Sequence, residues 1–337
     1  VKFTFERLKD PKRASIQAFL WGPVQTVKIL DEYTVQIIND KPNGPMIRNL
    51  AIGCMLPPKA YDQDKFGTEP IGTGPFVFKE WVRGQKLVME ANKDYWGGPP
   101  KAKKITYFPI PEEATRIAAL RKGDLDVTFT VPVDQVKLLE GDEKIKMEKI
   151  LSCDTHVLSI GGKETKLFED HRLRQAASYA INRQAMIEKI LYGFAQMPRS
   201  VISPMVFGFN PNLPPGPVTY DVEKAKSLMK AAGKEAGFEA ELMYVNGSLP
   251  KIADLALAVA ADLQKIGITC KVRVFPDFAV GGTFLQPGKF DMFYNSWTTY
   301  TLDADMPFWR NWHSSNSREG TGKYDYGKDL DALIEKG

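Results

Sequence analysis

The sequence lacks two features that are typical of membrane-spanning and nucleic-acid-binding proteins. No run approaches the ~18 consecutive apolar residues that a transmembrane helix requires. No block of five or more basic residues occurs, although the chain holds 45 Lys and Arg against 41 Asp and Glu, with a net charge of +4. Because a nucleic-acid surface requires basic residues gathered in a patch, we expect no nucleic-acid partner.

Cysteine is scarce, with only Cys54, Cys153 and Cys270 among 337 residues. Their separations do not fit a metal-binding motif such as CxxC. One disulfide with a free thiol and three separate buried thiols both fit this number, and the spacing identifies no pair. Cys270 alternates with apolar residues in a β-rich segment, which predicts that it faces a core.

Motifs for catalysis or phosphate binding are incomplete. The three histidines, His156, His171 and His313, are far apart, and no GxSxG elbow accompanies them. Gly72–Pro75 is rich in glycine, but no Lys-Ser/Thr follows it to hold a nucleotide. Pro75 also lacks the N–H that a phosphate loop would donate, which favours a tight turn into a strand. We therefore expect no enzymatic activity, no metal and no cofactor.

The length and the two ends indicate a two-domain protein that is cut at both ends. Single hydrophobic cores stop growing at roughly 250–300 residues, and this chain has 337. Val1–Leu8 is already a patterned element with no signal-peptide pattern before it. Leu330–Gly337 has the apolar spacing of a helix.

The first half of the chain alternates hairpins with a single clear helix. Period-2 alternation and turn residues predict the hairpins, and acidic first-turn residues with a glycine at the end predict the helix. The expected elements are the hairpins Val24–Ile38 and Phe76–Glu90, the strand Ile105–Phe108, the helix Glu112–Lys122 ended by Gly123, and the strand Leu125–Thr130. A strand, a helix and a strand in this order suggest an α/β unit.

The second half repeats this pattern more strongly. Helices are expected after the capping residues Asp170 and Asp221, and an i, i+3, i+4, i+7 apolar stripe runs from Ile252 to Ile266. Strands are expected at 239–245, 268–275 and 290–297. Strands alternating with helices are typical of a mostly parallel sheet.

Four motifs, in order over nearly the whole chain, resemble a single family. They are Ile71–Phe76 with Asn92–Gly98, Ala118–Asp126, Phe168–Arg183, and Tyr220–Met229. Together they resemble the peptide-type (dipeptide/oligopeptide) extracellular solute-binding proteins of ABC importers, family 5. Val1–Leu8 resembles a segment that lies well inside the mature chains of this family, so the fragment is expected to lack both ends.

The resemblance implies an α/β fold of the two-lobed periplasmic binding protein type II kind, with mixed sheets flanked by helices and an incomplete larger lobe. Residues 1–70 would be the remainder of the small subdomain of lobe I, 71–155 part of the lobe I core, and 156–337 lobe II without its return to lobe I. It also implies an exported protein, periplasmic or at the cell surface. Such a protein would act as a monomer, bind a small-molecule or peptide ligand by hinge closure, and deliver it to ABC permease subunits.

The segment Asn295–Ser315 is the strongest candidate for a ligand site. It follows an apolar strand, and ligands bind outside the carboxyl ends of parallel strands in α/β folds. Trp297 and Tyr300 enter the loop directly and are predicted to contact ligand. Trp309 and Trp312, at near-helical spacing, are predicted to belong to the core.

The resemblance implies a carboxylate three residues after the strand-end tryptophan, which binds the α-ammonium of a peptide. This position is Tyr300, and the nearest carboxylates are Asp303 and Asp305. We predict ligand binding by Trp297, Tyr300, Asp303 and Asp305. A di- or oligopeptide is the leading ligand, whereas a non-peptide solute such as an oligosaccharide, or a sensor role in place of transport, remain alternatives.

Overall fold

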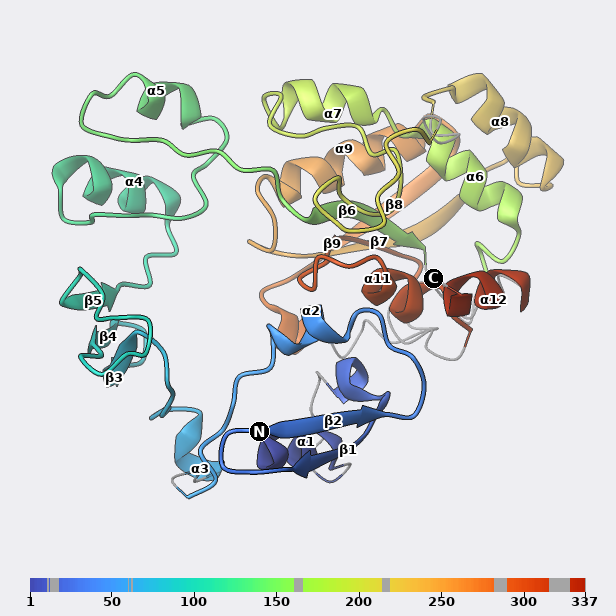
Figure 1. Cartoon of the computed structure of the whole chain (residues 1–337). Coiled ribbons are helices and arrows are strands. Elements are labelled where there is room, and N and C mark those ends of the chain that lie inside the picture. The colour runs from blue at the N-terminus through green and yellow to red at the C-terminus, as the bar shows by residue number, and fades with distance from the viewer. Residues whose placement is uncertain are drawn as a thin grey trace. The chain divides into compact units, whose positions relative to one another are not determined.

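The computed structural model divides into two compact units, residues 1–128 and 129–337. It describes residues 1–10, 12, 18–59, 61, 63–160, 166–213, 219–281, 290–314 and 328–336. Among these residues, no helix combines the length and the apolar character needed to span a membrane. The fold is α/β, with mixed sheets and flanking helices as the sequence predicted (Figure 1).

The first unit contains two small antiparallel sheets joined by short helices. In chain order its elements are α1 (Lys2–Lys9), η2 (Ala18–Trp21), β1 (Val24–Ile29), β2 (Val35–Asn39), α2 (Met46–Leu50), α3 (Gln63–Phe66), β3 (Phe76–Val82), β4 (Lys86–Ala91), β5 (Lys104–Tyr107) and α4 (Glu113–Lys122). Strands β1 and β2 pair with each other, and β3, β4 and β5 form a three-stranded sheet. Both predicted hairpins are therefore confirmed.

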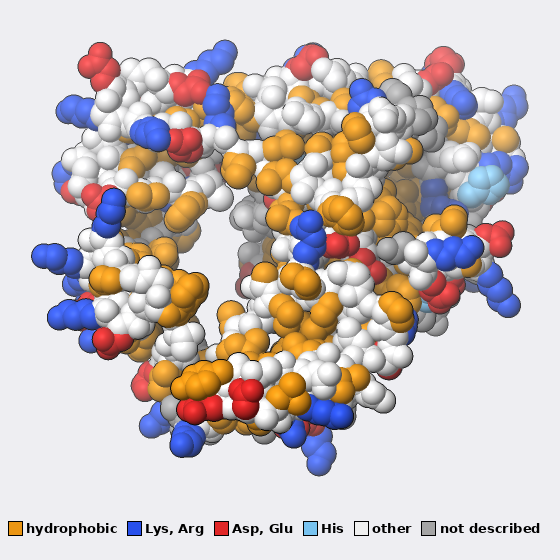
Figure 2. Space-filling view, viewed as in Figure 1, with side chains coloured by type: hydrophobic (Ala, Val, Ile, Leu, Met, Phe, Trp, Pro, Cys, Tyr) orange, Lys and Arg blue, Asp and Glu red, His pale blue; other side chains and the backbone are white. Residues whose placement is uncertain are grey.

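A small core lies beneath the first hairpin. Trp21 is fully buried, and its ring packs edge-on against Phe5 with the centroids 5.0 Å apart. The outer side of this hairpin is apolar and open, since Ile29, Leu30 and Tyr33 are exposed. Hydrophobic side chains are correspondingly visible over the β1–β2 region at the bottom of Figure 2.

The glycine-rich motif before β3 is a turn, as expected. The side-chain amide of Asn92 donates a hydrogen bond to the Gly74 carbonyl (2.9 Å), and the Asn92 backbone N–H donates to the Pro75 carbonyl (2.8 Å). Asn92 directly follows β4, so these bonds fasten the start of β3 to the end of its partner strand. The two halves of this motif therefore depend on each other for local structure.

Helix α4 has the termini that the sequence predicted, but the strand after it was wrongly predicted. The Glu112 carboxylate caps the first turn, and Gly123 ends the helix in the left-handed region with a φ of 88°. The segment Leu125–Thr130 is irregular, and Thr130 has a φ of 55°, outside the extended region. Its alternating residues Val127 and Phe129 are exposed. Period-2 alternation therefore failed here because no sheet pairs with the segment in the part of the chain that is described.

The second unit is built on a four-stranded mixed sheet. Its elements are α5 (Val136–Glu140), β6 (Asp154–Ile160), α6 (His171–Ala180), α7 (Arg183–Lys189), α8 (Val222–Ala231), β7 (Phe238–Val245), α9 (Ile252–Gln264), β8 (Ile268–Phe275), α10 (Phe278–Gly281), β9 (Met292–Thr298), α11 (Asp305–Asn311) and α12 (Lys328–Lys336). The strand order is β6-β9-β7-β8, in which β7 is parallel to β8 and β9 and β6 is antiparallel to β9. The prediction of parallel strands between 239 and 297 is confirmed.

The main core lies between this sheet and helices α6, α8 and α9, on one side of the sheet in Figure 1. The predicted stripe of α9 is buried, including Leu255, Val259 and Leu263. Asp170 and Asp221 cap α6 and α8 as predicted, because their carboxylates accept backbone N–H groups of the first turns. The opposite face of the sheet carries a smaller apolar cluster and faces α11.

The cysteines form no disulfide in the described residues. Cys153 and Cys270 are partly buried, and Cys270 packs against the main core as expected. Burial raises the pKa of the Cys270 thiol to about 11. Cys54 is exposed, so the interpretation as three buried thiols was wrong for this residue, which lies in a short irregular segment after α2.

Candidate functional site at the carboxyl end of strand β9

Strands β7 and β9 diverge at their carboxyl ends. Their paired positions are Leu242 with Met292 and Met243 with Phe293. Beyond Phe293, β9 continues for five residues that pair only with β6 in the part of the chain that is described. A gap between neighbouring strand ends is where α/β proteins place ligands, and the candidate segment starts at this point.

Trp297 lies on β9, opposite Thr155 of β6, and is partly buried. The guanidinium carbon of Arg310, on α11, lies 5.3 Å from the centroid of the Trp297 ring. One face of the indole is therefore covered by a cation. The indole nitrogen Nε1 is buried and has no hydrogen-bond partner, which is costly for a donor unless something else pairs with it.

Tyr300 stands in the turn that follows β9, between two buried threonines, and is itself 40 % exposed. The next residue but one, Leu302, has a φ of 53°, a conformation that costs a non-glycine residue free energy. The Leu302 carbonyl accepts a hydrogen bond from the Phe207 N–H (3.0 Å), and the Ala304 N–H donates to the Phe207 carbonyl (3.0 Å). The segment around Phe207 thus holds the turn in its strained conformation and fixes Tyr300 at the surface.

Asp303 and Asp305 are brought together at the start of α11. Asp303 is only 9 % exposed, and its Oδ1 accepts a hydrogen bond from the Asp305 backbone N–H at 3.1 Å. Asp305 is the first residue of α11 and is partly buried. The Asp303 carboxylate therefore shapes the turn into α11. Ser315, the last residue of the candidate segment, lies outside the described residues.

The aromatic residues of α11 pack mainly against their own helix and its continuation. Trp309 stacks on His313 with the ring centroids 4.0 Å apart, and Trp312 contacts Phe308. Both tryptophans are partly buried. His313 is buried, and its Nε2 lies 3.3 Å from Glu335 Oε1 on α12.

The three histidines have separate surroundings. His156, on β6, places its Nδ1 3.2 Å from the Tyr294 hydroxyl, and burial lowers the pKa of the imidazole. His171 is exposed at the start of α6. Within the described residues, no group of three or more His, Cys, Asp and Glu side chains could hold a metal ion.

Sequence reasoning did not single out Asn295, which is the first residue of the candidate segment. Its side-chain Oδ1 is buried without a hydrogen-bond partner, like the indole nitrogen of Trp297 two residues later. Side chains two apart on a strand share a face. The signal in the sequence was an amide followed at i+2 by a tryptophan within a strand that is otherwise apolar.

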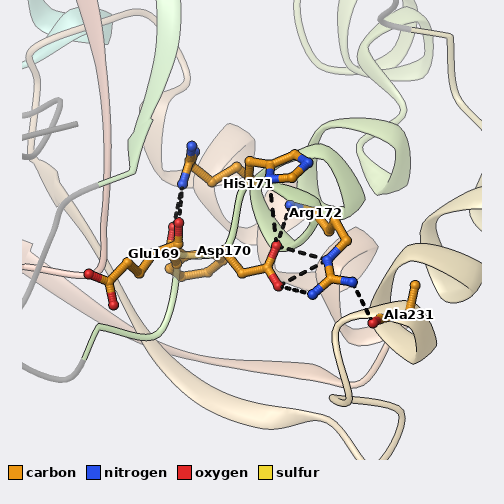
Figure 3. Close-up of polar contacts among 7 residues, drawn as sticks. Glu169, Asp170, His171, Arg172 and Ala231 are labelled. Atoms are coloured by element: carbon orange, nitrogen blue, oxygen red, sulfur yellow. Dashed lines mark hydrogen bonds and ion pairs between the residues drawn. The ribbon is translucent and has the colours of Figure 1, made fainter. Parts of the chain in front are cut away.

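A hollow of about 570 Å³ at the start of α6 is a structural joint (Figure 3). Arg172 binds the Asp170 carboxylate through Nε and Nη2 and donates from Nη1 to the Ala231 carbonyl of α8. The hydrogen bonds from Arg172 lower the pKa of Asp170 to about 2. These groups are satisfied by each other and join α6 to α8, and none of the residues that line the hollow belongs to the β9–α11 segment.

Comparison with known proteins identifies relatives of the whole chain. The family model for the bacterial extracellular solute-binding proteins, family 5 (middle), matches residues 1–319. The dipeptide-binding protein of Escherichia coli K12 is 27% identical over 332 residues, which are 93% of this chain and 60% of that protein. The glutathione-binding protein GsiB of Pectobacterium atrosepticum is 28% identical over 316 residues, covering 90% of this chain and 60% of that protein.

Solved structures have the same fold. The periplasmic binding protein DppA of Helicobacter pylori, in complex with the peptide STSA, is 26% identical with a TM-score of 0.83 and covers 99% of this chain and 68% of its own. The oligopeptide-binding protein AppA of Bacillus subtilis, in complex with a nonapeptide, is 24% identical with a TM-score of 0.85 and covers 99% of this chain and 70% of its own. The chain thus spans about 60% of the length of the curated relatives it matches.

Proposed function

The chain belongs to family 5 of the bacterial extracellular solute-binding proteins, and from this we infer that the whole protein is the solute-binding component of an ABC importer. It captures a di- or oligopeptide and delivers it to membrane permease subunits. The observation that carries the proposal is the family match over residues 1–319, with relatives named for dipeptide and glutathione binding. It acts outside the cytoplasm, as a monomer, without nucleic acid and without catalysing a reaction.

We propose that Trp297 and Tyr300 contact the ligand, and that Asp303 and Asp305 hold the turn that presents them. The divergence of β7 and β9 beyond Phe293 supports this assignment, as do the exposure of Tyr300 and the buried position of Asp303. Residues 1–155, in two parts divided near 70, would contribute to lobe I, and 156–337 would form lobe II. Ligand contacts with both lobes would stabilise the closed form.

A thermal-shift screen of the intact protein tests the proposed function. A ligand that binds only the folded state, at 100 times its Kd, stabilises a protein by about 2.7 kcal/mol, so a bound peptide should raise the unfolding midpoint by several degrees. Dipeptides, tripeptides, glutathione and maltooligosaccharides would be compared. The Tyr300→Ala variant should lose the shift while its ligand-free midpoint stays within about a degree, because Tyr300 is at the surface.

A screen in which no peptide shifts the midpoint, while an oligosaccharide does, would replace the peptide with a sugar. The covered face of the Trp297 indole leaves a single face for sugar stacking, which disfavours this alternative. The sensor alternative predicts that deletion of the gene leaves peptide uptake intact. Uptake of labelled peptide by the deletion strain distinguishes transport from sensing.

A further inference from the structure

Two buried polar atoms on one face of β9 have no hydrogen-bond partner, Oδ1 of Asn295 and Nε1 of Trp297. One is an acceptor and the other a donor. They lie on the face of β9 that carries Phe293, away from the main core, which holds Met292 and Tyr294. Leaving a buried polar atom unpaired costs roughly 1–3 kcal/mol, so two on the same face point to a group that binds there.

The strand neighbours of these residues do not supply the missing partners. Asn295 pairs with Val157 of β6, whose side chain is apolar, and Trp297 pairs with Thr155. On the other side, the pairing with β7 ends at Phe293. The unpaired donor and acceptor therefore lie where β9 has lost one of its two neighbouring strands.

The spacing of the two groups fits an amide-bearing ligand. Residues two apart on a strand are separated by about 6.8 Å, and groups on one side of an extended peptide recur at this same interval. A carbonyl oxygen of the ligand would accept from Trp297 Nε1, and an N–H of the ligand would donate to Asn295 Oδ1. A hydroxyl-rich sugar could satisfy both atoms, but it lacks this fixed alternation of donor and acceptor.

The charge next to Trp297 determines which end of such a ligand lies there. The Arg310 guanidinium covers one face of the indole, and a second cation placed beside it would be repelled. The Asp303 carboxylate is directed into the turn, where it accepts the Asp305 N–H. The groups around Trp297 thus favour a neutral or anionic part of the ligand over an ammonium.

We propose that Asn295 and Trp297 together bind an amide group of the ligand, and that the part of the ligand at Trp297 is not a free α-ammonium. This inference rests on the proposed function, because it specifies the ligand at the same site. It assigns a ligand contact to Asn295 and predicts tolerance of peptides whose amino group is blocked.

Titration calorimetry on the intact protein tests the ligand charge, with trialanine and N-acetyltrialanine as probes. N-acetylation should weaken binding less than tenfold, because no anionic group at Trp297 holds the ammonium. A loss of tenfold or more would overturn the inference while leaving peptide binding intact. Absence of binding by both probes would overturn it as well, and a thermal-shift screen without any peptide response would show that the proposed function itself had failed.

Variants of β9 test the hydrogen bonds. Asn295→Leu has a similar shape but no acceptor, and should weaken the binding of N-acetyltrialanine at least fivefold. Ser296→Ala changes the opposite face of the same strand and should leave the affinity unchanged. The ligand-free Asn295→Leu protein should unfold at the same or a higher temperature, because it loses an unpaired buried acceptor. Unchanged affinity, or a lower unfolding temperature without ligand, would overturn the assignment of Asn295.

Discussion

Lys251 Nζ lies 2.7 Å from Asp134 Oδ2, and this ion pair joins the residue before α9 to the segment that leads into α5. Asp134 and Lys251 are 117 positions apart in the sequence. Lys251 has a φ of 55°, so the backbone at the start of α9 adopts a disfavoured conformation next to the ion pair. The pair therefore helps to fix both the start of the helix and the first residues of the second unit.

Replacing Asp134 should make stability less dependent on acid. The hydrogen bond from Lys251 lowers the pKa of Asp134, so its contribution is present above the unfolded-state pKa near ~4 and is lost as the pH falls through the lower folded-state value. Asp134→Asn should cost about 0.5–1 kcal/mol at pH 7, since the pair is partly exposed. Urea unfolding at pH 7 and pH 2.5 measures this, and an equal loss at both values would contradict the ion pair.

The Asp170–Arg172 pair predicts different effects for two cap residues. Asp170→Asn keeps a cap at α6 but removes the charge that Arg172 binds, whereas Asp221→Asn at α8 removes a charge with no such arginine. Because the pKa of Asp170 is lowered to about 2, its contribution should be present above pH ~4 and disappear towards pH 2. Asp170→Asn should therefore be the more destabilising variant at pH 7, and the two should converge near pH 2. Thermal melts across this range test the prediction.

Two glycines that join β7 to β8 should not tolerate a side chain. A Cβ on Gly237 would lie 2.2 Å from the Gly267 carbonyl oxygen, and Gly237 has a φ of 77°. Gly247 has a similar φ of 68° but nothing within 4 Å. Gly247→Ala should cost about 1–2 kcal/mol from backbone strain alone. Gly237→Ala should cost clearly more or prevent folding, and equal unfolding midpoints for the two variants would contradict the close approach.

His156 should make the protein less stable in mild acid. Burial lowers the pKa of the imidazole, so the unfolded chain binds more protons than the folded chain near pH 6. Stability is then fully present above the unfolded-state pKa of ~6.5 and is lost as the pH falls through the folded-state value. His156→Gln, which does not titrate, should lose less stability than the unmodified protein between pH 7.5 and pH 5. Parallel slopes over this range would show that His156 takes no part.

Much of the fold could be predicted because its signals are local. The cap at Asp170, the turn at Gly84 and the apolar stripe of α9 depend on neighbours within a few residues, and they are where the sequence indicated. The strand at 125–130 failed because a strand also needs a partner, which alternation alone does not provide.

The candidate site was harder to predict because it depends on tertiary contacts. The sequence indicated the segment after β9 but not the roles within it. Asp303 looks like an available carboxylate in the sequence, yet the turn that Phe207 holds buries it. The cation over Trp297 comes from Arg310, one helix further on. Neither contact leaves a periodic pattern.

The position of β9 in the sheet also constrains how the second unit is made. β9 is the last strand in the chain, yet it lies between β6 and β7. During synthesis the ribosome releases β6, β7 and β8 before the strand that joins them exists, and Leu242 and Met243 have no neighbour on that side until residue 293 has emerged. Pairing of β6 with β9 closes a loop of more than 100 residues, which is slow. The nascent chain therefore exposes apolar strands for most of its synthesis and will require chaperone protection against aggregation.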